Sequence, residues 1–136
     1  MTHLNRLVAW FEQLSPTSLE DIATIYHANS YFKDPFNEFY QRDELKKLFA
    51  NMFEKLQNPR FVIEETISQS NSTFIVWHFD FSLRQRRLQI KGSSHIKFDE
   101  TGLVTYHRDY WDAAEELYEK LPVIGYVFKQ LKKIGH

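Results

Sequence analysis

The sequence of 136 residues contains no cysteine, which excludes disulfide bonds and thiolate chemistry and is compatible with a reducing compartment. It also has no excess of positive charge, because 17 Lys and Arg stand against 18 Asp and Glu, for a formal net charge of −1. A nucleic-acid partner is therefore not expected, since proteins that bind nucleic acids carry a basic surface. No apolar run approaches membrane-spanning length, and the N-terminus does not resemble an export signal. We expect a cytoplasmic protein.

Aromatic residues, by contrast, are abundant. Phe, Tyr and Trp make up 16% of the sequence, and so many rings need a large interior, a lined cavity or an oligomer interface. The length is sufficient for one domain with a substantial core. Because the chain shows no internal repeat, low-complexity tract or linker, we expect a single domain over residues 1–136.

The first half of the chain has the spacing of amphipathic helices. Residues 3–14 carry apolar side chains at i, i+3, i+4 and i+7, which predicts a helix that ends at Ser15-Pro16. A second helix is predicted over residues 19–28 and a third over residues 43–56, with a short extended segment at residues 31–36 between them. The residues of the second helix that are predicted to face inward are Leu19, Ile22, Ala23 and Tyr26.

From Phe61 onwards the apolar residues follow a period of two, which is typical of strands. The predicted strands cover residues 61–68, 74–83, 88–98 and 103–111. The alternation places Trp77 and Phe79 on one face of the second strand, and Ser94 and Ile96 on one face of the third. For residues 103–111 the alternation leaves the inward face open. Helices that precede such a sheet and cover one of its faces leave a hollow between the layers.

The end of the sheet region holds a polar cluster. His107, Asp109 and Trp111 alternate along one strand face, so the imidazole and the carboxylate can share a substrate or a water, or can simply bond to each other inside the protein. A metal site is not expected, because His-x-Asp offers two ligands and zinc or iron sites generally need three. Asp112, with Glu115 three residues later, predicts the cap of a helix that runs to about residue 120.

The order helix, helix, Asp-Pro, helix, sheet resembles the superfamily that is like nuclear transport factor two. Within it, the chain looks most similar to SnoaL-like polyketide cyclases and ketosteroid isomerases, over about residues 3–115. The most specific segments are LEDIATIYHANSYFKDP at 19–35 and SHIKFDETGLVTYHRDYWD at 94–112. The resemblance implies an α+β cone, in which a curved antiparallel or mixed sheet is covered by three N-terminal helices. It also implies a homodimer through the outer sheet face, where Phe74 and Val76 are otherwise hard to place.

The resemblance also suggests site residues. In ketosteroid isomerases the aspartate of the Asp-Pro pair is the base that moves the proton, and Asp34 matches it. The two oxyanion donors of that family fall at Trp10 and Ser94 here, which argues against a true steroid isomerase. SnoaL-like cyclases use a late-strand aspartate and histidine as acid and base, and Asp109 and His107 match these loosely. The residues expected to contact the ligand are Trp10, Tyr26, Trp77, Phe79, Phe81, Ser94, Ile96 and Trp111.

Two functions follow from these residues. The first is a cofactor-free acid/base enzyme of the isomerase, cyclase, dehydratase or epoxide-hydrolase type, acting on a small apolar molecule, with Asp34, His107 and Asp109 as its catalytic groups. The second is a non-catalytic module that binds a ligand or another protein. Asp34 itself has a second interpretation, as a residue that turns the chain before Pro35 with its carboxylate bonded to backbone amides.

The last segment, residues 121–136, has the pattern of a basic amphipathic helix. Its apolar positions are Val123, Ile124, Val127, Phe128, Leu131 and Ile134. We expect it to brace the domain or its dimer mate. Docking to a membrane surface is the less favoured alternative, because the segment carries few cations for binding anionic lipid.

Overall fold

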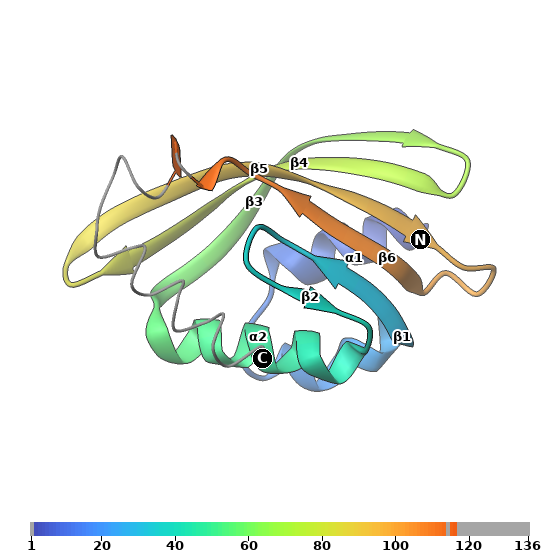
Figure 1. Ribbon diagram of the computed structural model, residues 1–136, viewed down its shortest axis with the longest axis horizontal. Coiled ribbons are helices and arrows are strands. Elements are labelled where there is room, and N and C mark those ends of the chain that lie inside the picture. The colour runs from blue at the N-terminus through green and yellow to red at the C-terminus, as the bar shows by residue number, and fades with distance from the viewer. Residues whose placement is uncertain (1, 114, 117–136) are drawn as a thin grey trace.

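The computed structural model describes residues 2–113, 115 and 116 of the chain (Figure 1). The elements in chain order are α1 (His3–Glu12), the 3-10 helix η1 (Ser18–Thr24), β1 (Tyr26–Lys33), β2 (Glu38–Phe39), α2 (Arg42–Lys55), β3 (Gln57–Gln69), β4 (Ser72–Leu83), β5 (Arg86–Phe98) and β6 (Val104–Tyr110). Within the described residues the strands form one sheet of six, in the order β2-β1-β6-β5-β4-β3.

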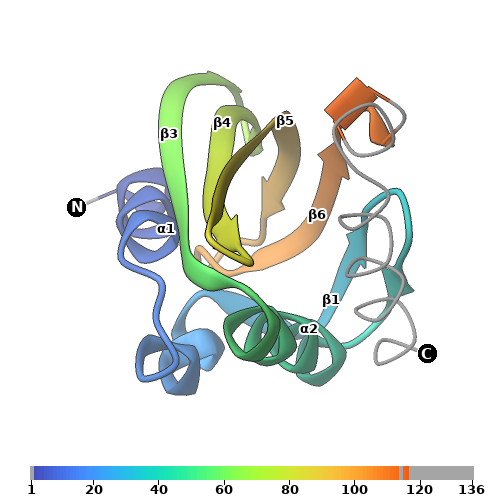
Figure 2. The same ribbon diagram turned by 90° about the vertical axis from the view of Figure 1, so that its left-hand side faces the viewer.

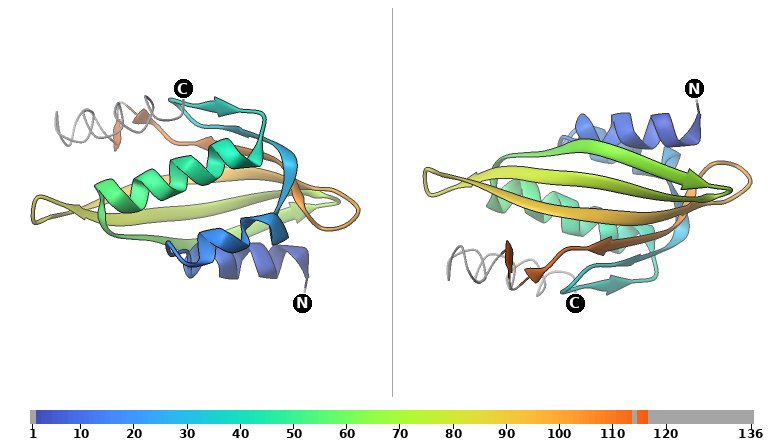
Figure 3. Two further views of the ribbon diagram at one scale, coloured as in Figure 1. Left: turned by 90° about the horizontal axis from the view of Figure 1, so that it is seen from below. Right: turned by 90° about the horizontal axis from the view of Figure 1, so that it is seen from above.

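The sheet is strongly curved, and the helices lie on its inner side (Figure 2). Seen from below, α2 crosses the sheet, with α1 and η1 beside it, and the view from above shows the opposite, outer face of the sheet (Figure 3). Strand β1 runs parallel to β6, whereas the other neighbouring strands pair antiparallel. The expected α+β architecture, with three helices on one side of a curved mixed sheet, is confirmed.

Helix α1 forms as its apolar spacing predicts. The Thr2 hydroxyl caps it by accepting a hydrogen bond from the backbone N–H of Asn5 at 3.0 Å, which satisfies one of the free amides of the first turn. Leu7, Trp10 and Phe11 are buried on its inner side. The helix ends at Glu12, shortly before the Ser15-Pro16 break.

The second predicted helix is wrong in length and type. The segment forms a 3-10 helix only to Thr24, and Ala23 is exposed on it. Tyr26 is fully buried, but from the first position of strand β1, where it pairs in parallel with Val104 of β6. The spacing of apolar residues permits either structure. The strand forms because it pairs with a segment about 80 residues away, and such long-range pairing overrides local propensity.

Helix α2 and strand β3 both begin earlier than predicted. The helix starts at Arg42, after Gln41 in an extended conformation, and β3 starts at Gln57. Asn58 has a positive φ of 51° and the β3–β4 register shifts between Gln57 and Arg60. Pro59 therefore lies in an irregular stretch of an edge strand, which is where a residue without an N–H is tolerated.

The inner faces of β4 and β5 agree with the predicted alternation. The buried side chains of these faces are Ile75, Trp77, Phe79, Phe81, Ile90, Ser94 and Ile96. Gly92 pairs directly with Trp77, and a Cβ at Gly92 would lie 2.6 Å from the indole ring. Only glycine leaves room for this ring to lie across β5, and the ring is one wall of the pocket described below.

Strand β6 shows why its pattern did not reveal the inward face. Val104 and His107 are both buried on the inner side, although they lie three residues apart. The register with β5 shifts between Phe98 opposite Val104 and Lys97 opposite Tyr106. This irregularity inserts one extra residue, so the parity changes and Asp109 joins His107 on the inner face.

The outer face leaves apolar residues in solvent, notably Phe74 at 40% exposure, which stacks on His95 with ring centroids 4.5 Å apart. A homodimer through this face stays a prediction. Asp112 acts as the predicted cap, because its Oδ1 accepts a hydrogen bond from the backbone N–H of Glu115 at 3.0 Å. The remainder of that helix and the segment 121–136 lie outside the described residues. None of the helices described here is long and apolar enough to cross a membrane.

Candidate functional site

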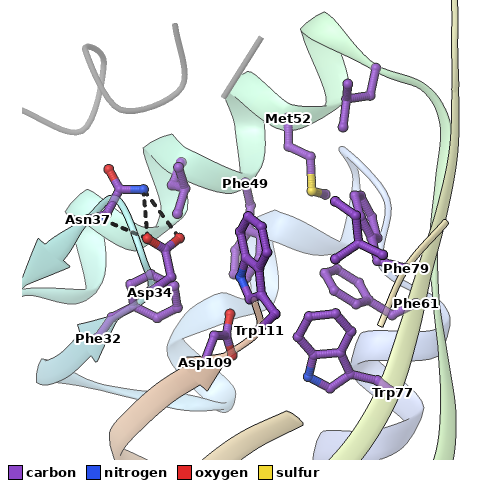
Figure 4. Close-up of a pocket in the computed structure, with 13 residues that line it drawn as sticks. Phe32, Asp34, Asn37, Phe49, Met52, Phe61, Trp77, Phe79, Asp109 and Trp111 are labelled. Carbon is purple, nitrogen blue, oxygen red and sulfur yellow. Dashed lines mark hydrogen bonds between the residues drawn. The ribbon is translucent and has the colours of Figure 1, made fainter. Parts of the chain in front are cut away.

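A pocket of about 70 Å³ lies between α2 and the inner face of the sheet (Figure 4). Its walls are mostly apolar, and its carboxyl groups come from Asp34 and Asp109, with Asn37 beside the first. The described residues that line it are Phe32, Asp34, Asn37, Leu48, Phe49, Met52, Leu56, Phe61, Trp77, Phe79, Ile90, Asp109 and Trp111. The volume is that of a few water molecules or one small organic group.

The two aspartates meet because β1 and β6 are parallel. Phe32 pairs with His107 and Lys33 pairs with Arg108. The residues that follow this last pair along the two strands are Asp34 and Asp109, which therefore lie side by side. Phe32 and His107 are both buried and their ring centroids lie 4.9 Å apart. Since side chains two residues apart share a face, Asp34 and Asp109 both point inward. Figure 4 shows their carboxyl groups near each other, with Phe61, Phe79 and Trp77 on the other side of the pocket.

Asp34 sits in a turn that its own carboxylate holds. Its Oδ1 accepts hydrogen bonds from the backbone N–H groups of Phe36 (2.8 Å) and Asn37 (2.7 Å), and the Asn37 amide donates to both of its oxygens (3.1 and 3.2 Å). The two interpretations of Asp34 are therefore compatible, because the residue both shapes the turn before Pro35 and lines the pocket.

The environment of Asp34 favours its neutral form. Its pKa is raised from 3.8 to about 6 by burial and, to a lesser extent, by the negative charge of Asp109, while the hydrogen bonds from Phe36 and Asn37 act in the opposite direction. Burial is the largest contribution, as expected for a carboxyl group between apolar walls. A carboxyl group with this pKa exchanges protons near neutral pH, which is the property that a general base or acid needs.

Asp109 belongs to a hydrogen-bonded chain of side chains. Its Oδ1 accepts from the Ser94 hydroxyl at 2.5 Å and from His107 Nε2 at 2.6 Å. Ser94 accepts in turn from the indole N–H of Trp77 at 2.8 Å, and His107 Nδ1 is 2.7 Å from the Tyr26 hydroxyl. Within the described chain Oδ2 of Asp109 has no hydrogen-bond partner, so one oxygen is held and the other is available to a ligand.

His107 orients Asp109 and does not reach the pocket between the aspartates and α2. Burial, and then the charge of Asp109, raise the pKa of Tyr26, so its hydroxyl keeps its proton and shares a hydrogen bond with Nδ1. The imidazole then donates from Nε2 to Asp109, and the rings of Phe11 and Phe32 enclose it. His107 lines only a second, deeper cavity of about 20 Å³, which also includes Ser94 and Asp109.

The other predicted contact residues divide into two groups. Trp77, Phe79 and Trp111 line the pocket, and Ser94 lines the deeper cavity. The remaining four lie in the core and line neither cavity: Trp10, Tyr26, Phe81 and Ile96. The indole N–H of Trp10 donates to the Ser18 carbonyl oxygen at 3.3 Å, and the Tyr26 hydroxyl is hydrogen-bonded to Nδ1 of His107.

Sequence reasoning missed several pocket residues. Asn37 is the clearest, because Asp-Pro-Phe-Asn is a turn sequence in which the first side chain accepts from later amides. Phe32 lies in the predicted extended segment and Phe61 at the start of a predicted strand, and neither had a predicted facing direction. Leu48 and Met52 lie within the third predicted helix, but the apolar pattern of a helix does not distinguish a core contact from a pocket wall.

No group of three or more His, Cys, Asp or Glu side chains that could hold a metal ion occurs among the described residues. A wide surface groove lies outside the pocket and shares Asp34, Asp109 and Trp111 with it. The other residues of this groove are Lys33, Pro35, Arg108, Tyr110 and Asp112. The two aspartates thus stand between an apolar interior and an open entrance.

Comparison with known families decides the relationship. The sequence profile of the SnoaL-like domain matches residues 7–107, which is most of the chain. The chain belongs to the SnoaL-like domain family. The matched region ends at His107, so it includes Asp34 but stops short of Asp109. The search of curated proteins found no match.

Solved structures share the fold of this SnoaL-like domain at low sequence identity. An LEH-like epoxide hydrolase of M. tuberculosis has a TM-score of 0.74 at 14% identity, covering 95% of this chain and 92% of its own. A protein of Catenulispora acidiphila with a ketosteroid isomerase-like fold, solved in complex with trimethylamine, has a TM-score of 0.73 at 14% identity, covering 90% of this chain and 96% of its own. A SnoaL-like polyketide cyclase of Agrobacterium tumefaciens has 0.73 at 13%, covering 88% and 98%. These likenesses establish the fold.

Proposed function

We propose that this SnoaL-like domain is a cofactor-free acid/base enzyme that acts on a small, largely apolar molecule. One observation carries the proposal: a carboxyl group with a pKa of about 6, Asp34, opens into an apolar pocket. Above pH 6 this group is mostly ionised and takes a proton from the ligand as a second bond of the ligand rearranges. The proton then returns to the ligand or passes to water, and no electrons are exchanged with a cofactor.

Asp109 is the fixed partner of Asp34 in this scheme. Ser94 and His107 hold its Oδ1, so the carboxylate keeps one orientation while Asp34 gains and loses its proton. The charge of Asp109 raises the affinity of Asp34 for a proton. Asp34 is therefore a stronger base than an isolated aspartate, which favours proton transfer from weakly acidic ligands.

Steroid-type isomerisation remains disfavoured by the geometry. The side chains at the two positions of the oxyanion donors are already engaged, because Trp10 donates to Ser18 and Ser94 donates to Asp109. An enolate in the pocket would also lie near the Asp109 carboxylate. Reactions in which the ligand stays neutral, or in which the negative charge is spread over a stabilised leaving group, suit this site better than those that place an enolate charge beside Asp109.

A non-catalytic, ligand-binding role is the second candidate, and the hydrogen bonds of Asp34 favour it. A carboxylate that accepts two backbone amides is sufficient to explain an aspartate in this turn. The two functions differ in what the charge of Asp34 does. If the residue only shapes the turn, asparagine replaces it without loss of any chemical step, since an amide oxygen accepts the same two bonds.

The test uses 5-nitrobenzisoxazole, a flat aromatic probe whose ring opens when a base removes its carbon-bound proton. The electrons of the C–H bond form the nitrile as the N–O bond breaks, and the product is a coloured cyanophenolate. We expect the wild-type rate to rise with pH through about 6, and Asp34→Asn to lower it about 100-fold, the usual contribution of a general base.

The matched control is Asp112→Asn, which removes a carboxylate from the outer groove and keeps a residue that caps helices equally well. Asp112→Asn should retain the wild-type rate within about twofold. Equal rates for wild-type protein and Asp34→Asn, both folded by circular dichroism, would leave the ligand-binding role as the function.

A further inference from the structure

The charge of the pocket is unbalanced. Among the described residues that line it are two carboxyl groups and no lysine, arginine or histidine. Lys33 and Arg108 precede the two aspartates, but alternate residues of a strand point to opposite faces. Accordingly, the guanidinium of Arg108 lies 4.8 Å from the ring of Tyr110 on the outer side. Both cations line the external groove and not the pocket.

The two carboxyl groups accept hydrogen bonds from groups around the pocket. Asp109 accepts from the Ser94 hydroxyl and from Nε2 of His107, and neither of these residues lines the pocket. Asp34 accepts from backbone and side-chain amides. A buried carboxylate without a counter-ion is costly and shifts toward its protonated form. Below about pH 6 a proton on Asp34 relieves the repulsion between the two groups, and above that pH both are mostly charged.

The walls around these carboxyl groups are rich in ring faces. The aromatic residues that line the pocket are Phe32, Phe49, Phe61, Trp77, Phe79 and Trp111. The face of an aromatic ring carries negative electrostatic potential and attracts cations, most strongly for tryptophan. Rings and carboxylates together therefore attract positive charge and repel negative charge.

We propose that the ligand of this pocket is a small organic cation, an amine that is protonated or quaternary and has an apolar body. The inference rests on the function proposed above for the same site and adds the charge of its substrate. The carboxylates of Asp34 and Asp109 bind the cationic group, and the rings enclose its carbon atoms.

A cationic ligand also accounts for the lack of oxyanion donors. When a base removes a proton from a cation, the product is neutral, so no negative charge accumulates beside Asp109. The proton passes from a carbon of the ligand to the Asp34 carboxylate, the electrons of this C–H bond form a C=C double bond, and the neighbouring C–N bond breaks so that its electron pair leaves with the nitrogen as a neutral amine. Trp10 and Ser94 can then be engaged elsewhere without cost to the reaction.

Binding of the cation should release protons near pH 6. A positive charge beside Asp34 favours its ionised form. The groups that face Asp34 are Asp109 from β6 and Asn37 from its own turn, whereas α2 presents Leu48 and Met52 among its apolar residues. Lys33 and Arg108 lie on the outer side. The proton that is released is therefore assigned to Asp34.

The experiment compares probes of one shape and three charges: benzylammonium, benzyl alcohol and benzoate. Binding is measured by isothermal titration calorimetry and by the fluorescence of the pocket tryptophans at pH 7.5. We expect benzylammonium to bind about tenfold or more tightly than benzyl alcohol, the scale of one well-formed cation–π or charge contact, and benzoate to bind weakest. At pH 6, titrations in buffers of different ionisation enthalpy should show about half a proton released per benzylammonium bound.

The variants Asp34→Asn and Asp109→Asn should each reduce the preference for benzylammonium, and the double variant should abolish it while still binding benzyl alcohol. Asp112→Asn should keep the preference, because that carboxylate lies in the outer groove. Equal or tighter binding of benzyl alcohol or benzoate by wild-type protein overturns the proposal, as does an unchanged preference in folded Asp109→Asn. The benzisoxazole assay separates the two proposals: turnover that depends on Asp34 without an amine preference refutes only the ligand class, and an amine preference without such turnover refutes only the chemistry.

Discussion

Replacing Asp34 by asparagine should make the protein more stable at neutral pH. The substitution keeps an oxygen that can accept the backbone N–H groups of Phe36 and Asn37, at 2.8 and 2.7 Å in the native turn, and it removes the charge. Since burial and the charge of Asp109 both oppose ionisation of Asp34, the ionised side chain destabilises the folded state. The increase in the free energy of unfolding on substitution therefore measures how much the charge of Asp34 destabilises the folded state.

The size and the pH dependence of this gain follow from the two pKa values. The pKa of Asp34 is about 6 in the folded protein against 3.8 for the ordinary group, so the folded state binds more protons than the unfolded state between these values. The stability of wild-type protein therefore falls as pH rises from about 4 through 6. A difference of about two pKa units corresponds to about 3 kcal/mol at pH 7.5, and to only about 0.5 kcal/mol at pH 4.

The assay is urea unfolding of wild-type protein, Asp34→Asn and the control Asp112→Asn at pH 4 and pH 7.5. The free energy of unfolding of Asp34→Asn, relative to wild type, should increase by about 2.5 kcal/mol between the two pH values. Asp112→Asn should stay within about 0.5 kcal/mol of wild type, as for most surface changes. If Asp34→Asn lowers stability at pH 7.5, or shifts it equally at both pH values, then the hydrogen bonds of the turn outweigh burial. The acid/base role built on the raised pKa then fails.

Two further substitutions test the walls of the site. Gly92→Ala should lower the free energy of unfolding by about 1–3 kcal/mol in a thermal assay and weaken the binding of benzylammonium. The added Cβ would lie 2.6 Å from the ring of Trp77 and must push this ring into the pocket. Unchanged stability and binding would show that the ring is mobile. Tyr26→Phe should lower the free energy of unfolding by about 1–3 kcal/mol, since it leaves the buried Nδ1 of His107 without its hydrogen-bond partner. The control Tyr31→Phe removes an exposed hydrogen bond to a carboxylate and should lower it by less than about 1 kcal/mol. Equal losses would contradict a stabilising role for the buried hydrogen-bonded side chains.

Part of the pocket lining could be predicted from the sequence, and part could not. His107 and Asp109 stand two apart in a strand, so their common face was readable from the sequence once the strand was accepted. Their different roles were not, because only the packing of Phe11 and Phe32 around His107 closes the imidazole off from the pocket beside α2. Asn37 was missed because its contribution is a pair of hydrogen bonds to Asp34 across a turn, and turns leave no periodic pattern.

The inner faces of β4 and β5 could be read from the amino-acid pattern, because in each strand a period of two can bury its apolar side chains in only one way. The pattern also indicated the order of helices and sheet and the aspartate before Pro35. Three features could not be read from it: Tyr26 begins a strand, an irregularity in β6 turns His107 and Asp109 inward, and parallel β1 and β6 bring Asp34 beside Asp109. Each of these depends on pairing between segments far apart in the chain, whose energy appears only when both partners are in place.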